Sequence, residues 1–280
     1  GMNEHIFEHD GDQRPNFERL MKRPAPERCY AIHFTPRSGS SWLTDAAERS
    51  GVLGSPRECF NPNFMPEMVR ALGAFDLEEY IEVLGRRFQA AGTWGFEITH
   101  FQLERIFETD AAFHAHFGDA RHIWLIREDI VAQAVSLQKM HETGVSHSVS
   151  MSADDRQSAE ERFAFDAEAI GTWLLHIRRL ETITEKYFNA FGIAPLRLSY
   201  ERLMSHTPGD VIGAISRFVG AGEVDNADVT STHEKVGTPR NLEFADRFRK
   251  ENRAFCSYVA EDRQPFLSGL ESDLTRVARA

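Results

Sequence analysis

The segment from Thr35 to Ser41 places one cation, Arg37, beside Ser38, Gly39, Ser40 and Ser41. An apolar run, residues 30–34, precedes the segment, and apolar residues at helical spacing follow it. A turn of small residues between a strand and a helix offers backbone N–H groups and a helix N-terminus, which together suit an anion. The sequence therefore predicts a phosphate-binding loop in which Arg37 supplies the positive charge.

This loop differs from the one that binds ATP in P-loop kinases. A Walker loop ends in Gly-Lys-Ser/Thr, so that the lysine reaches the phosphates and the hydroxyl holds Mg²⁺. Here Arg37 comes before the glycine, and no lysine follows it. The missing lysine counts against an ATP- and Mg²⁺-dependent small-molecule kinase. That kinase and a non-catalytic nucleotide-binding module are the two alternatives to the function predicted below.

A second segment pairs an arginine with a serine. Arg127 follows the apolar run 121–126, and Ser136 lies just over two turns into the predicted helix that comes next. A guanidinium fork and a hydroxyl suit one phosphate dianion. Taken alone, however, the segment is better explained by an ion pair of Arg127 with Glu128 or Asp129 and by a packing role for Ser136.

In this order, the two segments resemble the nucleotide-binding motifs of sulfotransferases that use 3′-phosphoadenosine 5′-phosphosulfate. The match is closest to the bacterial trehalose sulfotransferase family, and it spans residues 30–219. The matching positions are Arg-Ser-Gly-Ser at 37–40, Gly-x-Pro-x-Glu-x-Phe at 54–60, Trp-Gly at 94–95, Gln-Ala-Val-Ser at 133–136, and Tyr200. The single loop is weak evidence, whereas the ordered set is fairly specific.

The resemblance implies a role for each matching residue and adenosine 3′,5′-bisphosphate as the product. Arg37 would stabilise the leaving phosphate, within a cradle formed by Ser38, Gly39, Ser40 and Ser41. The 3′-phosphate would be held by Arg127 and Ser136. Tyr200 approaches the nucleotide or is a core tyrosine at a strand end, and Arg240 is the candidate to close over the nucleotide. A sulfuryl group carries less charge than a terminal phosphate, so we expect no metal.

Two residues compete for the role of general base. By resemblance the base is Glu58, whose carboxylate suits the role if partial burial raises its pKa; the alternative is a solvated acid paired with Arg57. His100 is the rival, because a Thr-His pair carries the base in the cytosolic sulfotransferases of animals and imidazole titrates near neutral pH. His100 could also be a hydrogen-bonded histidine at a strand end. We favour Glu58, with His100 as a substrate contact or second base.

The acceptor is less well defined by the sequence. By resemblance, the acceptor group is a hydroxyl of a carbohydrate or glycolipid. The partner that carries it would be a small molecule or a glycan. The family has a lysine after its Trp-Gly-Gly, whereas this chain has Phe96-Glu97, so the acceptor stays open. We expect loops 62–74 and 144–157 to select it. The resemblance also makes a homodimer a candidate assembly.

Charge and cysteine content narrow the class of protein further. A formal net charge of −11 disfavours nucleic acid and anionic membranes as partners. No apolar run approaches the roughly 20 residues of a membrane span, and the N-terminal residues do not resemble a signal peptide. The 3 cysteines are scattered, without a Cys-x-x-Cys pair, which favours a reducing cytoplasm and argues against structural zinc.

The pattern of elements predicts an α/β fold, a P-loop-like three-layer sandwich with a central parallel sheet flanked by helices. Strands are expected at 30–34, 93–98, 121–126 and 196–198, with ligands at their carboxyl ends. The expected helices are 76–91, 129–141, 159–188 and one containing 211–219. No repeat or sharp break in composition divides residues 1–280, so one domain is predicted. Residues 1–27 would be an irregular arm and 223–280 a C-terminal cap or tail.

Overall fold

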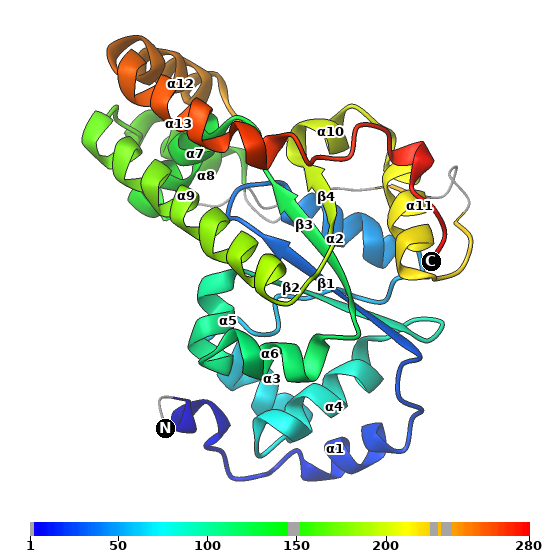
Figure 1. Ribbon diagram of the computed structural model, residues 1–280. Coiled ribbons are helices and arrows are strands. Elements are labelled where there is room, and N and C mark those ends of the chain that lie inside the picture. The colour runs from blue at the N-terminus through cyan, green and yellow to red at the C-terminus, as the bar shows by residue number, and fades with distance from the viewer. Residues whose placement is uncertain (1–2, 145–151, 225–228, 231–236) are drawn as a thin grey trace.

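A parallel sheet forms the centre of the protein (Figure 1). The computed structural model describes residues 3–144, 152–224, 229–230 and 237–280. Its strands lie in the order β2-β1-β3-β4, and every neighbouring pair is parallel. Their bounds are Arg28–Phe34 for β1, Thr93–Ile98 for β2, Arg121–Ile126 for β3 and Leu196–Ser199 for β4. The predicted α/β class and all four predicted strands are confirmed.

The register of the sheet brings three chain segments together at one edge. His33 pairs with Ile98 of β2, and Phe34 pairs with Leu125 of β3. Because the strands are parallel, their carboxyl ends meet at this edge, with β1 between β2 and β3. The loop that follows β1 is therefore flanked by the residues that follow β2 and β3.

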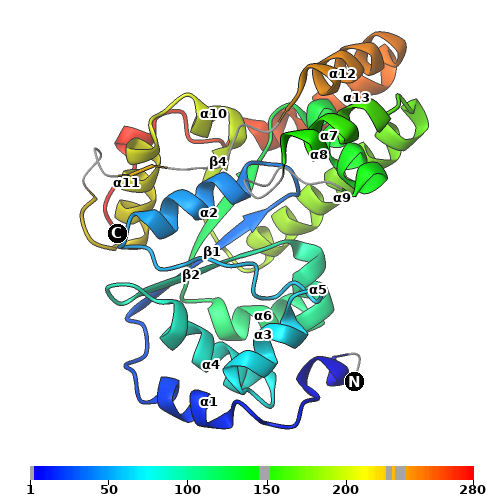
Figure 2. The ribbon, with the colours of Figure 1, turned by 180° about the vertical axis from the view of Figure 1, so that it is seen from behind.

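Two helices cover one face of the sheet. Helix α2, Ser40–Arg49, buries Leu43, Ala46 and Ala47, whose spacing forms a single apolar stripe. Helix α11, Pro208–Val219, packs into the same cluster, which includes Tyr30 and Ile32 of β1. In Figure 2, α2 lies on the near side of the sheet.

An aromatic core lies against the opposite face. It contains phenylalanines of several elements, among them Phe60, Phe96, Phe107, Phe113 and Phe117. The surrounding helices are α3 (Met65–Leu72), α4 (Leu77–Phe88), α5 (His100–Phe107) and α6 (Asp110–Phe117). Asp76, Thr99 and Thr109 cap the last three of these helices through side-chain hydrogen bonds. Helices α3, α5 and α6 were not predicted, because each is only 8 residues long.

Two of the sequence predictions about helices are wrong. Residues 1–27 are not an irregular arm throughout, because Glu4–Phe7 forms a 3₁₀ helix, η1, and Arg14–Met21 forms helix α1. Helix α1 has a proline in its first turn and packs against α4. The predicted helix 159–188 is two helices, α8 (Ala153–Arg162) and α9 (Ala167–Ala190). Phe163 ends α8 in extended backbone, and the Asp166 side chain caps α9.

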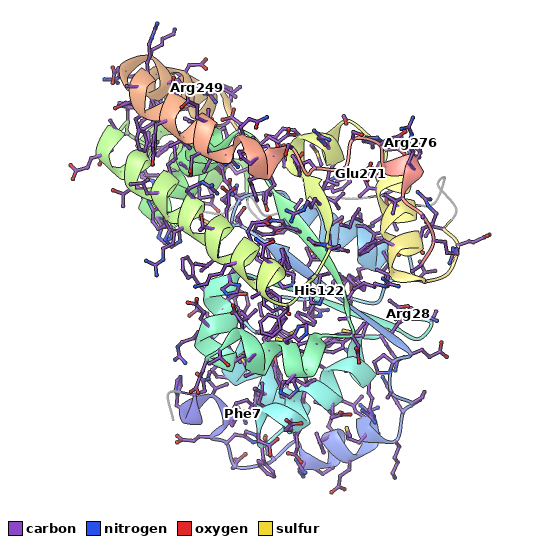
Figure 3. The ribbon with its side chains drawn as sticks, in the orientation of Figure 1. Phe7, Arg28, His122, Arg249, Glu271 and Arg276 are labelled. Carbon is purple, nitrogen blue, oxygen red and sulfur yellow. The ribbon has the colours of Figure 1, made fainter. Side chains whose placement is uncertain are left out.

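A helical lobe extends beyond the sheet (Figures 1 and 2). It joins α7 (Ile130–Thr143), α8 and α9 to α12 (Pro239–Glu251) and α13 (Arg253–Leu267), so the C-terminal segment is largely helical. Figure 3 shows Arg249 on this lobe, where its Nη2 lies 2.5 Å from Oδ2 of Asp129. In the described part of the chain, no helix has both the length and the apolar character to cross a membrane.

Candidate functional site

The loop after β1 has the backbone geometry of an anion cradle. Arg37 has a φ of 62° and Gly39 a φ of 87°, both in the left-handed region. Gly39 is also the N-cap of α2, whose first N–H groups have no acceptor within the helix. A Cβ atom on Gly39 would lie 2.7 Å from Cδ1 of Tyr200. The glycine is therefore required both by the turn and by the close approach of Tyr200.

Five of the predicted nucleotide-binding residues meet at this loop. Arg37 donates from Nε to Oγ of Ser136 at 2.8 Å. Arg127 donates from Nη1 to the carbonyl oxygen of Arg37 at 3.3 Å. The guanidinium carbon of Arg127 lies 5.0 Å from the ring centre of Tyr200, so Tyr200 belongs to the site and packs between Arg127 and Gly39.

The alternative explanation of the Arg127 segment does not hold. The Glu128 carboxylate accepts a hydrogen bond from Ser199, and Asp129 pairs with Arg249. Neither acid forms an ion pair with Arg127 in the part of the chain that the structure describes. Arg127 is nevertheless only 6% exposed. Glu201, Tyr200 and Asp129 lie near enough to favour its charged form, and the buried guanidinium lies beside the loop.

The two arginines make this site electropositive and incompletely hydrogen-bonded. Burial, with a contribution from Arg127, lowers the pKa of Arg37 to about 10, and burial also lowers the pKa of Arg127. Within the described residues, Nε of Arg127 and Oγ of Ser38 are buried without a hydrogen-bond partner. Buried donors of this kind normally have a partner, so the loop fits a phosphate-bearing ligand.

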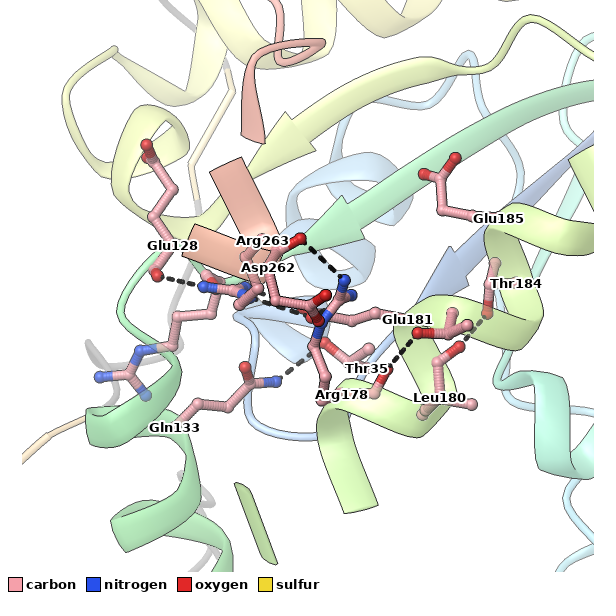
Figure 4. Close-up of polar contacts among 12 residues, drawn as sticks. Thr35, Glu128, Gln133, Arg178, Leu180, Glu181, Thr184, Glu185, Asp262 and Arg263 are labelled. Atoms are coloured by element: carbon pink, nitrogen blue, oxygen red, sulfur yellow. Dashed lines mark hydrogen bonds and ion pairs between the residues drawn. The ribbon is translucent and has the colours of Figure 1, made fainter. Parts of the chain in front are cut away.

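Helix α7 holds the loop in place through one glutamine. Gln133 donates from Nε2 to Oγ1 of Thr35 at 2.8 Å (Figure 4). The same Nε2 donates to the carbonyl oxygen of Pro36 at 2.7 Å. This residue opens the Gln-Ala-Val-Ser match, so the motif contains both a loop-positioning residue and, at Ser136, a contact to Arg37.

A buried ion pair holds the end of β3. Arg263 donates from Nη2 to Oε2 of Glu181 at 2.8 Å and to the carbonyl oxygen of Arg127 at 2.9 Å (Figure 4). Its Nη1 donates to the carbonyl oxygen of Glu128 at 2.7 Å. Sequence reasoning missed this pair. The available signal was Glu181 itself, an acid that continues the apolar stripe of Leu174 and Ile177.

The segment carrying Glu58 is fixed on both sides of that residue. Gly54 has a φ of 69°, and a Cβ there would lie 2.6 Å from the carbonyl oxygen of Thr93. The Glu97 N–H donates to the carbonyl oxygen of Arg57 at 3.0 Å, and Phe60 is fully buried. The glycine and phenylalanine of the matched segment therefore place Glu58 beside the end of β2.

Glu58 lines a cavity of about 370 Å³ next to the loop. Its Oε1 accepts a hydrogen bond from Nε2 of Gln102 at 2.8 Å. Burial raises the pKa of Glu58, partly offset by hydrogen bonds from Gln102 and Asn61. Arg57 pairs with Glu48 at 4.0 Å rather than with Glu58. The cavity is lined by Ser41, Thr44, Asp45, Glu48, Pro56, Arg57, Glu58, Phe64, Met68 and Glu97.

The structure places the rival base elsewhere. His100 is the first residue of α5, and it is not among the residues that line the cavity. Nε2 of its buried ring lies 2.9 Å from Oδ1 of Asp110. Burial lowers the pKa of His100, partly offset by Asp110 and Glu104. The geometry therefore favours Glu58 over His100 for contact with a ligand in the cavity.

Arg240 is likewise not brought to the loop. Its Nη1 donates to the carbonyl oxygens of Glu160, Glu161 and Phe163, at the end of α8. These contacts make Arg240 a cap of α8. The two predicted acceptor loops are partly helical: most of 62–74 is helix α3, and the end of 144–157 belongs to α8. Phe64 and Met68 of the first segment line the cavity, whereas residues 145–151 lie outside the described residues.

Comparisons with known proteins agree with the resemblance seen in the sequence. The family model Stf0 sulphotransferase matches residues 80–251, and no curated protein matches the chain. A solved sulfotransferase from Alicyclobacillus acidocaldarius is similar at 16% identity, with 84% of this chain and 96% of that chain covered. Its TM-score of 0.46 is too low for a conclusion about this protein. The family model, however, covers more than half of the chain, and on that basis the chain belongs to the Stf0 sulphotransferase family.

Proposed function

We propose that the protein transfers a sulfuryl group from 3′-phosphoadenosine 5′-phosphosulfate to a hydroxyl of a carbohydrate or glycolipid. The observation that carries the proposal is the meeting of Arg37, Arg127 and Ser136 at a loop that adjoins the cavity of Glu58. Membership of a sulfotransferase family supports the reaction class. A homodimer, a cytoplasmic location and independence of metal stay predictions.

The loop residues divide between binding and charge stabilisation. Arg127 and Ser136 would hold the 3′-phosphate, and the α2 N-terminus from Ser38 to Ser41 would hold the 5′ side. When bound, the donor supplies an activated sulfuryl group with a phosphate as its leaving group. Arg37 and the N–H groups of α2 would stabilise the negative charge that grows on that phosphate, because they are fixed before the reaction begins.

Glu58 would remove the proton from the acceptor hydroxyl. Its cavity is shared with Ser41, the last residue of the loop, so an acceptor there lies beside the phosphate site. Hydrogen bonds from Gln102 and Asn61 orient the Glu58 carboxylate within the cavity. A raised pKa makes the carboxylate a stronger base than a fully solvated one.

Calorimetry in metal-free buffer tests the identity of the nucleotide. We expect adenosine 3′,5′-bisphosphate to bind roughly tenfold or more tightly than ADP, because Arg127 and Ser136 contact the 3′-phosphate. Arg127→Gln should remove this preference. The control is Arg121→Gln, an exposed residue at the opposite end of the same strand, which should preserve it. A preference for ADP with Mg²⁺ would contradict the proposed donor and favour a kinase.

A further inference from the structure

Glu97 is a buried carboxyl group that the reaction described above does not use. It is the second-last residue of β2, is 8% exposed, and pairs in register with Ile32, whose side chain packs in the cluster of α2. It lines the cavity of Glu58, and its Oε2 has no hydrogen-bond partner among the described residues. A buried polar atom at the wall of a cavity is a candidate contact for a ligand.

The charges around Glu97 disfavour its ionised form. Glu58, Asp45 and Glu48 line the same cavity, and the one cation among the lining residues, Arg57, is directed to Glu48. Burial, reinforced by Glu58, raises the pKa of Glu97 well above its usual range. Of the four carboxyl groups that line the cavity, Glu58 and Glu97 therefore differ in protonation, with Glu58 available as the base and Glu97 holding its proton.

We propose that Glu97 binds the acceptor as an uncharged carboxylic acid and thereby selects a neutral polyhydroxy compound. This inference rests on the proposed function of the site. A carboxylic acid presents one donor and one acceptor, which matches a hydroxyl group next to the reacting one. Phe64 is half exposed and, with Met68, offers an apolar wall to the C–H face of a sugar.

The same cavity disfavours anionic acceptors. A carboxylate or phosphate on the acceptor would lie near Glu58, Asp45 and Glu48, and like charges repel. The proposal therefore predicts that a neutral acceptor is preferred to an anionic one on the same scaffold.

Two acceptors on one sugar scaffold test this preference. Transfer of labelled sulfate from the donor is measured to methyl glucoside and to glucuronic acid. We expect methyl glucoside to have a kcat/KM roughly tenfold or more above that of glucuronic acid. A preference for glucuronic acid would overturn the proposal.

Two substitutions separate hydrogen bonding from volume. Glu97→Leu removes both the donor and the acceptor, and should raise the KM for methyl glucoside roughly tenfold while the affinity for adenosine 3′,5′-bisphosphate is kept. Glu97→Gln keeps a neutral donor and acceptor, and should recover most of that loss. Equal losses in the two variants would show that Glu97 only fills space, which contradicts the proposal.

Stability against pH tests the protonation of Glu97 without any transfer assay. Above a carboxyl group's ordinary pKa and below the raised one, the folded protein holds a proton that the unfolded chain has released. The contribution of Glu97 to stability therefore falls as pH rises through this window, and Glu97→Gln should remove that contribution from the measured slope. The control substitution Glu243→Gln, at an exposed position on α12, should leave the dependence of stability on pH unchanged. Parallel curves for wild type and Glu97→Gln would overturn the proposal, whereas a flattened curve without transfer to any alcohol would contradict the proposed function instead.

Discussion

Arg37 and Arg127 are two neighbouring cations, and the Arg127 side chain donates a hydrogen bond to the backbone carbonyl oxygen of Arg37. Their burial and mutual repulsion are unfavourable in the free protein, and burial lowers the pKa of both. The two phosphate groups of a bound nucleotide would offset that repulsion, the 3′-phosphate supplying an acceptor for Nε of Arg127 and the 5′-phosphate one for Oγ of Ser38. Residue chemistry thus favours a dianionic ligand over a neutral one.

Substitution of Glu58 separates binding from transfer. Glu58→Gln should bind adenosine 3′,5′-bisphosphate with unchanged affinity and lose transfer activity by roughly 10²- to 10⁴-fold, the usual contribution of a general base. Because the pKa of Glu58 is raised, wild-type activity should fall as pH decreases through values above the ordinary carboxyl range. Both quantities come from calorimetry and a labelled-sulfate assay. Full activity in this variant, together with its loss in His100→Ala, would identify His100 as the base.

Substitution of Gly39 tests the cradle. Gly39→Ala should weaken bisphosphate binding by roughly tenfold or more, since its Cβ would lie 2.7 Å from Tyr200 and the residue has a left-handed φ. Gly51→Ala is the matched control, with a φ of 74° but open space around its Cβ. That variant should lose only about 1 kcal/mol of stability and keep its affinity. Equal affinities in the two variants would show that Tyr200 does not define the cradle.

How far the sequence predicts the site depends on the type of residue. Arg37 and Arg127 were predictable because cations stand after the ends of strands, where a parallel sheet gathers them, and Ser136 because it matches a motif on the helix that follows. Glu97 was noticed only as a departure from the family, since nothing in the sequence indicates whether a strand-end acid is buried. Arg240 was placed in the site on its position alone, whereas its contacts at α8 depend on tertiary packing.

At the scale of elements, the order β2-β1-β3 puts the Glu58 cavity and the Arg127 segment on either side of the phosphate loop. The strands were predictable because buried parallel strands have nearly continuous apolar sequences. The break between α8 and α9 was not, because the apolar spacing continues across it and only the Asp166 cap marks the new start. Helix α1 was hidden by its polar composition.

The pair of Arg263 and Glu181 links three elements, so its loss should affect both stability and binding. Arg263→Ala leaves the buried Glu181 with only its 3.4 Å ion pair to Arg178, and losing the main partner of a buried charge costs up to about 3–5 kcal/mol. It also releases the carbonyl oxygens of Arg127 and Glu128, so bisphosphate affinity should decrease. Urea unfolding and calorimetry measure the two effects.

An exposed ion pair provides the control for Arg263→Ala. Arg276 pairs with Asp273 while its side chain is 81% exposed, so Arg276→Ala should change stability by less than about 1 kcal/mol. If Arg263→Ala kept wild-type affinity in its folded state, the pair would serve stability alone and would not position Arg127.

At the scale of the whole molecule, two histidines lie in the core between the sheet and the helices of the aromatic cluster. Nε2 of His33 lies 2.9 Å from Nδ1 of His122, and Nε2 of His122 lies 3.1 Å from the carbonyl oxygen of Phe117. The carbonyl requires a proton on Nε2 of His122, so its Nδ1 accepts from His33. Burial lowers the pKa of His122 to about 4 and the pKa of His33 well below its usual value.

These histidines should make the fold sensitive to mild acid. Between pH 6.5 and 4 the unfolded chain binds protons that the folded core excludes, so stability falls as pH decreases, by up to about 1.4 kcal/mol per pH unit for each histidine. Unfolding midpoints across this range measure the slope. His122→Asn should reduce it, and His5→Gln, at an exposed position, should leave it unchanged. An unaltered slope in His122→Asn would assign the acid sensitivity to other groups.

The contact from α13 to the end of β3 also has a consequence during biosynthesis. Arg37, Arg127 and Ser136 have all been synthesised by the middle of the chain, yet the side chain that holds the carbonyl oxygen of Arg127 is Arg263. A nascent chain on the ribosome can therefore form the sheet and the loop before it can fix their geometry. Capture of the nucleotide becomes a late event, and truncated translation products should lack it even where most of their fold has formed.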